Sequence, residues 1–139
     1  MATSKEYQII SFRDVNFHLR DILYYTQEEL VDYDRLTFEI HQTTEHLYSN
    51  VYEIYFHVLY RYEYSTDEKE IAEEIELLHT DFLCLFKYGK RKRKIPNSIL
   101  ISILEEIVSL ARGYLLSRTQ NLLFDVPVLP DIDIKKDLL

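Results

Sequence analysis

The sequence predicts an all-α protein, an antiparallel bundle of about four helices with an extended C-terminal tail. Two observations lead to this prediction. Between Ser11 and Asp125 the chain holds only two glycines and one proline, the residues that most often interrupt helices. Over the same region the apolar residues recur at spacings of three and four. The predicted organisation is an N-terminal extension over 1–10, a helical domain over 11–124 and a tail over 125–139.

The first helix is expected to begin at Ser11, because Ser11 and Asp14 have the spacing of a capping box with Asp in place of Glu. Its apolar face would consist of Phe12, Val15, Leu19, Ile22, Leu23 and Leu30.

A second helix is expected over residues 36–64. Its apolar stripe is Leu36, Ile40, Leu47, Val51, Ile54, Val58 and Tyr62. The acidic cluster at 32–34 is the preferred break before it, since Asp favours helix caps, and Ser49–Asn50 offers a further break. The alternative is one unbroken helix over 11–64. It would be about 80 Å long at 1.5 Å per residue and would require a dimer.

A third helix is expected to open at a capping box over 65–68 and to end at Gly89. Its apolar face is Ile71, Ile75, Leu78, Phe82 and Phe86.

A fourth helix would begin at Pro96 and Asn97, and Gly113 within it is interpreted as a point of close helix approach. Its stripe is Leu100, Ile103, Leu104, Ile107, Ala111, Leu115 and Leu122. Pro127 and Pro130 exclude a helix from the tail that follows. The apolar tail is expected either to lie across its own bundle or to cross to a partner.

Composition excludes several classes of protein. The net charge of -8 argues against a protein that coats nucleic acid along its whole surface. A glycine-rich phosphate loop, a nucleophile elbow and a paired-cysteine metal site are all absent from the sequence. The single cysteine, Cys84, is expected to be buried and unreactive. With no apolar signal sequence and no predicted membrane span, a cytoplasmic location is expected.

The strongest compositional anomaly is a run of basic residues that begins at Lys87. We call its continuous part, Lys90–Lys94, the basic loop. The residues predicted to contact an anionic surface are Lys87, Tyr88, Lys90, Arg91, Lys92, Arg93 and Lys94. Concentrated cations can bind phosphates locally, and the ring of Tyr88 could stack on a base. Docking of a protein, a nuclear import signal in a eukaryotic or viral source, and a merely solvated loop are the alternatives.

A second candidate site is Arg13 with His18. The segment Arg13-Asp14-Val15-Asn16-Phe17-His18 resembles the Arg-x4-His motif of the helical ribonucleases known as HEPN domains. The resemblance implies that Arg13 would stabilise the transition-state charge and His18 would act as general acid or base. It also implies a symmetric dimer. Arg35 and His41 have similar spacing.

Metal binding and cofactors are not predicted. Glu76 and His79 have the Glu-x-x-His spacing of bundle di-iron sites, but no second copy exists. Glu53 and His57 are interpreted as a pair that braces a helix surface.

Tyrosines are too many for one core stripe of the expected second helix, so an interface is predicted there. It would consist of Tyr48, Tyr52, Tyr55, Phe56, Leu59 and Tyr60.

These features predict a small interaction module, more probable as a binding protein than as an enzyme. It would self-associate, with a dimer favoured, and dock a protein or nucleoprotein partner through the basic loop. Nucleic acid is a candidate partner and a membrane is not. The alternatives are a HEPN-like ribonuclease and an acidic inhibitor or immunity protein that binds a basic enzyme.

Overall fold

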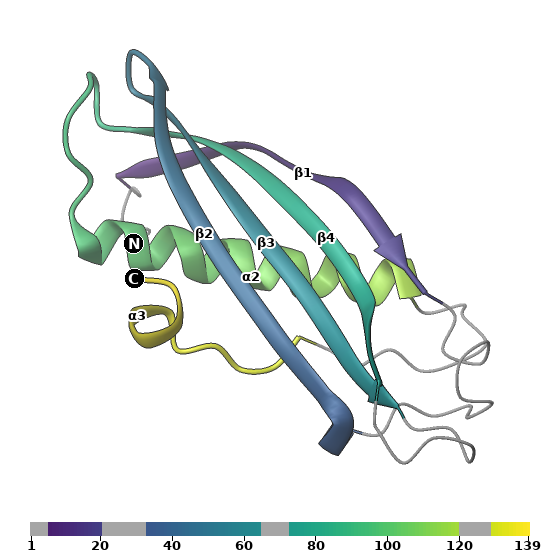
Figure 1. The fold of residues 1–139 in the computed structure, drawn as a ribbon. Helices are drawn as coiled ribbons and strands as arrows, with labels where there is room; N and C mark the ends of the chain where they lie inside the picture. The colour runs from purple at the N-terminus through teal and green to yellow at the C-terminus, as the bar shows by residue number, and fades with distance from the viewer. Residues whose placement is uncertain (1–5, 21–32, 65–72, 120–128) are drawn as a thin grey trace.

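The protein is built on an antiparallel β-sheet with one long helix against it (Figure 1). The computed structural model describes residues 6–20, 33–64, 73–119 and 129–139. Within them, four strands lie in the order β1-β4-β3-β2. Their bounds are Tyr7–Leu19 for β1, Leu36–Tyr48 for β2, Val51–Tyr64 for β3 and Glu73–Tyr88 for β4. A short 3-10 turn, η1 (Tyr33–Arg35), precedes β2.

The prediction of an all-α bundle is therefore wrong. The expected helices over 11–30, 36–64 and 65–89 are replaced, in their described parts, by strands. The expected break at Ser49–Asn50 is real, but it is a two-residue hairpin turn between β2 and β3, with Ser49 at a φ of 48°. β1 begins inside the expected N-terminal extension. The capping box at 65–68 and Asp32 lie outside the described residues, whereas the rest of the acidic cluster expected to break the helix, 33–34, lies in η1.

The apolar spacing misled the prediction because residues four apart lie on one face both in a helix, with about 3.6 residues per turn, and in a strand, whose side chains alternate with a period of two. Ile54, Val58 and Tyr62 are four residues apart, so they share one face of a strand as readily as one face of a helix. Strand composition was the better signal: nine of the fourteen residues of β3 are Val, Ile, Tyr or Phe, which favour strands. The hairpin turn uses neither glycine nor proline, so the sequence did not mark it.

The core lies on one face of the sheet, which we call the helix face. Phe56, Tyr60, Phe82 and Phe86 on that face are fully buried. The helix α2, Asn97–Thr119, packs there: its Tyr114 meets Phe82 edge-on with ring centroids 5.4 Å apart. Burial, with the nearby charge of Glu106, raises the pKa of the Cys84 thiol to about 12, in accord with the expected unreactive thiol.

The helix α2 confirms the predicted fourth helix. Residues of its expected stripe are buried: Ile103, Leu104, Ile107, Ala111 and Leu115. Leu122 lies outside the described residues. Within one copy of the chain the close helix approach expected at Gly113 is not found, because a Cβ built there meets nothing within 4 Å. Within the described residues, no helix is both long and apolar enough to span a membrane.

The described part of the tail, residues 129–139, docks on its own domain beside α2 (Figure 1). Leu129, Ile134 and Leu138 are buried, and Gln42 of β2 donates a hydrogen bond of 3.2 Å to the Leu138 carbonyl. The tail was expected to contain no helix, but it forms the short helix α3, Ile134–Asp137. Asp133 caps it by accepting a hydrogen bond of 3.2 Å from the Lys136 amide.

Gly113→Ala should stabilise the single folded chain by up to about 1 kcal/mol, because alanine is the better helix former and the added methyl meets open space within one copy. Urea unfolding monitored by circular dichroism measures the change. A loss of stability would show that this side of α2 is covered in solution.

Candidate functional site

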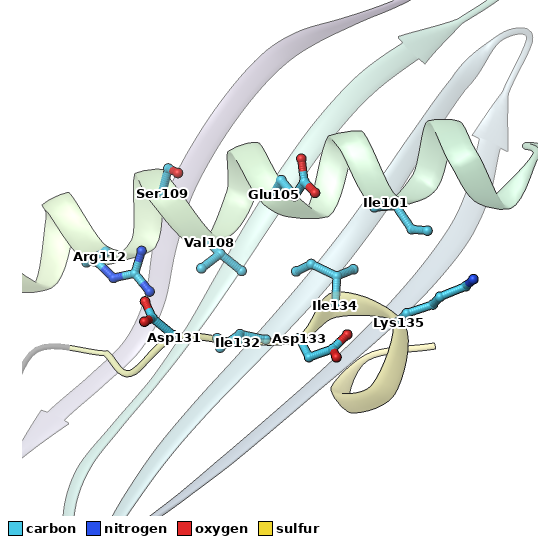
Figure 2. A pocket seen from close by; sticks show the side chains of 10 residues that line it. All are labelled: Ile101, Glu105, Val108, Ser109, Arg112, Asp131, Ile132, Asp133, Ile134 and Lys135. Carbon is cyan, nitrogen blue, oxygen red and sulfur yellow. The ribbon is translucent and has the colours of Figure 1, made fainter.

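A groove separates α2 from the C-terminal segment on the helix face (Figure 2). Its volume is about 530 Å³. Apolar side chains from both walls line it, and charged ones stand among them. The apolar set is Ile101, Val108, Ile132 and Ile134, and the charged set is Glu105, Arg112, Asp131, Asp133 and Lys135. We call this space the tail groove.

Arg112 fixes the outer wall of the tail groove. Its Nε donates to the Leu129 carbonyl at 3.1 Å, and its Nη2 donates to the Pro130 carbonyl at 2.9 Å. These charge-assisted bonds hold the segment at a set distance from α2. The width of the tail groove is therefore set by hydrogen bonds between its two walls.

A second groove of about 540 Å³ lies between β2, the basic loop and the start of α2. We call it the loop groove. It is lined by Thr44, His46, Tyr52, Lys92, Arg93, Lys94, Ile95 and Leu100. Leu100 lines this groove and the next residue, Ile101, lines the tail groove. Both grooves therefore reach the first turns of α2.

The basic loop links β4 to α2, so it follows a strand where a helix was expected. Arg93 holds the loop down: its amide donates to the Tyr52 hydroxyl at 3.0 Å, and its guanidinium lies 4.4 Å from the centroid of the Tyr88 ring. Tyr88 itself is buried beneath it. Arg93 also pairs with Glu6 at 3.8 Å. The other loop cations and Lys87 are exposed and have no ion pair with a described residue.

Arg13 and His18 do not form a helical catalytic pair. Both lie on β1, where they are register partners of Leu83 and His79 on β4. Because the fold is not helical, the HEPN-like ribonuclease interpretation is wrong.

The residues expected at a tyrosine interface are divided between the two faces of the sheet. Tyr52, Phe56 and Tyr60 are buried on the helix face, whereas Tyr55 and Leu59 lie on the opposite face, which we call the outer face. Tyr48 stands exposed at the hairpin turn. These six residues therefore do not form one continuous surface.

A cluster of histidines on the outer face was missed by the sequence analysis. His41 and His57 are register partners on β2 and β3, and His18 and His79 are partners on β1 and β4. The rings of His57 and His79 are 4.8 Å apart, so four histidines cross the sheet in one row. Asp81 is the register partner of His57, and its carboxylate contacts the rings of both His57 and His79. Strand alternation and register would have been needed to find the row.

The environment of Asp81 favours its charged form. Burial raises the pKa of the carboxyl, but hydrogen bonds from Tyr55 and His57 and the charges of His57 and His79 outweigh burial, so the pKa lies below its usual value. Burial and the bond to Asp81 raise the pKa of Tyr55 to about 12. Asp81 is therefore a carboxylate that accepts hydrogen bonds from its neighbours.

Comparison with solved structures finds the same fold elsewhere. One similar structure is the Mycobacterium tuberculosis Rv1957 SecB-like chaperone in complex with a ChAD peptide from the Rv1956 HigA1 antitoxin. The TM-score is 0.61 at 12% sequence identity, over 92% of this chain and 91% of that chain. No protein-family model and no curated protein matches the sequence. The fold is therefore SecB-like.

Tyr52→Phe should lower the free energy of unfolding by about 1–3 kcal/mol. The substitution removes a hydroxyl that donates to the Arg93 carbonyl at 2.6 Å and leaves the Arg93 amide without that partner. Thermal unfolding measures the loss, and faster hydrogen exchange of the Arg93 amide locates it. The matched control is Tyr48→Phe at the exposed turn, which should change little. Equal effects of the two variants would contradict the anchoring role of Tyr52.

Proposed function

We propose that this protein is an interaction module that binds an extended segment of another polypeptide in the loop groove and the tail groove. The observation that carries the proposal is the pair of partly apolar grooves beside α2 in a SecB-like fold. The similar chaperone was solved with a peptide bound. Each groove lies within the volume range of about 300–1,000 Å³ that is typical of binding pockets.

The edge of the sheet supports an extended ligand. β2 is an edge strand, so one side of its backbone has no partner strand among the described residues. Extended peptides bind such edges by main-chain hydrogen bonds, while pockets take alternate side chains. The loop groove borders β2 at Thr44 and His46. A segment lying there could pair with the strand and place apolar side chains against Ile95 and Leu100.

The charges indicate which segments would bind best. Lys92 and Lys94 line the loop groove and are exposed. The rest of the chain is acidic, since the whole carries a net charge of -8. A partner segment with apolar residues next to Asp or Glu would therefore be favoured at this groove and repelled elsewhere.

The test is fluorescence anisotropy with a labelled peptide of alternating apolar and acidic residues. Lys92→Gln with Lys94→Gln should weaken binding roughly two- to thirtyfold, because each exposed ion pair contributes about 0.2–1 kcal/mol. Binding by the wild type should also fall with added salt.

The matched control is Lys90→Gln with Arg91→Gln. It removes the same charge from the same loop at residues that do not line the loop groove. An equal loss of peptide affinity in both double variants would show that binding responds to the net charge of the protein and not to the cations that line the loop groove. Stronger binding of a labelled single-stranded RNA than of the peptide would contradict the proposal and favour a nucleic-acid partner.

Self-association is proposed through the solvent side of α2. Leu110 and Leu116 are 43% and 47% exposed. They stand three residues to either side of Gly113, and so flank it on the helix surface. The space above Gly113 is open, which leaves room for a helix from a second copy.

Leu110→Ser with Leu116→Ser should convert the protein to monomers, because it removes the apolar area on which association depends. Light scattering coupled to size exclusion gives the mass. Leu47→Ser at the hairpin end is the control, with a comparable exposure of 42%. A monomeric wild type would contradict self-association.

A further inference from the structure

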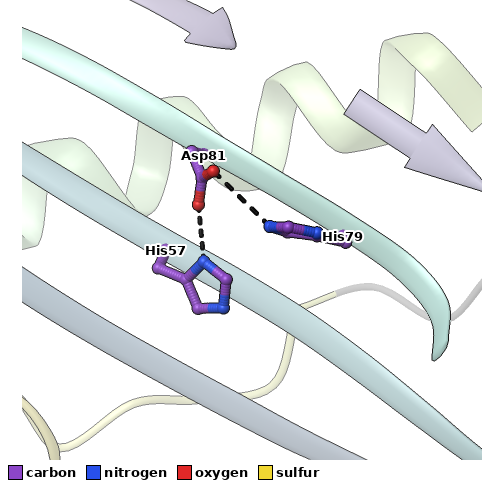
Figure 3. A group of neighbouring side chains, drawn as sticks. All are labelled: His57, His79 and Asp81. Atoms are coloured by element: carbon purple, nitrogen blue, oxygen red, sulfur yellow. Dashed lines mark hydrogen bonds and ion pairs between the residues drawn. The ribbon is translucent and has the colours of Figure 1, made fainter. Parts of the chain in front are cut away.

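The outer face carries a compact set of potential metal ligands (Figure 3). His57 comes from β3, and His79 and Asp81 come from β4. Residues 79 and 81 are two apart on one strand, and His57 is the register partner of Asp81, so all three share a face. Their ligand atoms all lie within 4.8 Å of one another.

Among the three potential ligands, His79 has a ring nitrogen without a hydrogen bond to a described residue. The Nε2 of His79 is buried, and it has no hydrogen-bond partner in the part of the chain that the structure describes. It lies 3.5 Å from Oδ2 of Asp81, too far for a good hydrogen bond. Buried polar atoms almost always have partners, and an ion is one way to supply the missing one.

We propose that His57, His79 and Asp81 bind one Zn²⁺ ion on the outer face of the sheet. Two imidazoles and a carboxylate are a ligand set that zinc takes in proteins, with the fourth position open to water. Magnesium and calcium prefer all-oxygen shells, so the two nitrogen ligands argue against them.

The distances suit a tetrahedral ion. At zinc–ligand distances of about 2.0–2.1 Å, neighbouring ligand atoms in a tetrahedron are about 3.4 Å apart. His79 Nε2 and Asp81 Oδ2 are already 3.5 Å apart. His57 Nδ1 and Asp81 Oδ1 are 2.5 Å apart, joined by a hydrogen bond that zinc would replace. Side-chain rotation would then have to bring the most widely separated ligand atoms, which lie within 4.8 Å of each other, to the tetrahedral spacing.

The surroundings also resemble those of a metal site. Tyr55 hydrogen-bonds to Asp81, and such outer bonds orient the ligands of bound metals. Asp81 is buried, whereas His57 and His79 are 24% and 30% exposed at their side chains. The carboxylate thus lies beneath two rings that an ion can approach from solvent. This site is independent of the proposed peptide binding, because α2 and both grooves lie on the helix face.

The experiment is calorimetric titration of the chelator-treated full chain with Zn²⁺, beside titration with Co²⁺ followed by visible absorption. Wild type should bind one ion at this site, and Co²⁺ should give the intense absorption of a tetrahedral site. His57→Gln and Asp81→Asn should each weaken binding by more than about 100-fold, which exceeds the effect of changing an outer-shell partner. Tyr55→Phe should weaken it by about 10–100-fold.

The matched controls are His41→Gln, next to His57 in the same row, and His46→Gln, outside the row. Both should bind as wild type does. Absence of Zn²⁺ binding by folded wild type, or equal binding by His57→Gln and wild type, would overturn the proposal. An octahedral Co²⁺ spectrum would also overturn it, and this readout does not depend on whether any variant folds. Peptide binding in the grooves is measured separately and should not change with Zn²⁺.

Discussion

The fold depends on covering one face of a long, twisted sheet. Phe56, Tyr60, Phe82 and Phe86 fill the helix face with aromatic rings, each of which gains about 1.5–3 kcal/mol on burial. A single helix is too narrow to cover this face alone, so the C-terminal segment lies beside α2 (Figure 1). The grooves occur where this two-part cover is incomplete. The grooves and the structural core are therefore parts of one packing arrangement.

The sequence predicted α2 correctly because a helix has its own signals. Pro96 and Asn97 mark its start. Its apolar spacings of three do not distinguish it, because the stripes expected over the strands contain them too, as between Val51 and Ile54. The strands lacked such signals. In β4, for example, Leu83 and Leu85 point to the outer face while Phe82 and Cys84 face the helix, so alternation is hidden in a continuous apolar run. Where both faces are apolar, pairing partners and not local periodicity determine the structure.

The candidate sites differ in how far the sequence could reveal them. The basic loop is contiguous, so its position between two elements was predictable from composition alone. The histidine cluster is not contiguous: His57 and His79 meet only through the register of β3 with β4. On a helix, Glu53 and His57 would have been neighbours; on a strand the relevant neighbour of His57 is Asp81. The error in secondary structure therefore hid which side chains are the neighbours of His57.

The pairing of β1 with β4 has a consequence for how the chain folds. β2 and β3 can form a hairpin as soon as both have been synthesised. Tyr7 of β1, in contrast, pairs with Tyr88, the last residue of β4, so β1 cannot pair until the whole of β4 has been made. Closing such a long connection is entropically costly and slow compared with local pairing. During synthesis the first strand therefore emerges long before its partner, with Ile9 and Phe12 uncovered. Until β4 has been made, the nascent chain is therefore prone to aggregate through its uncovered first strand.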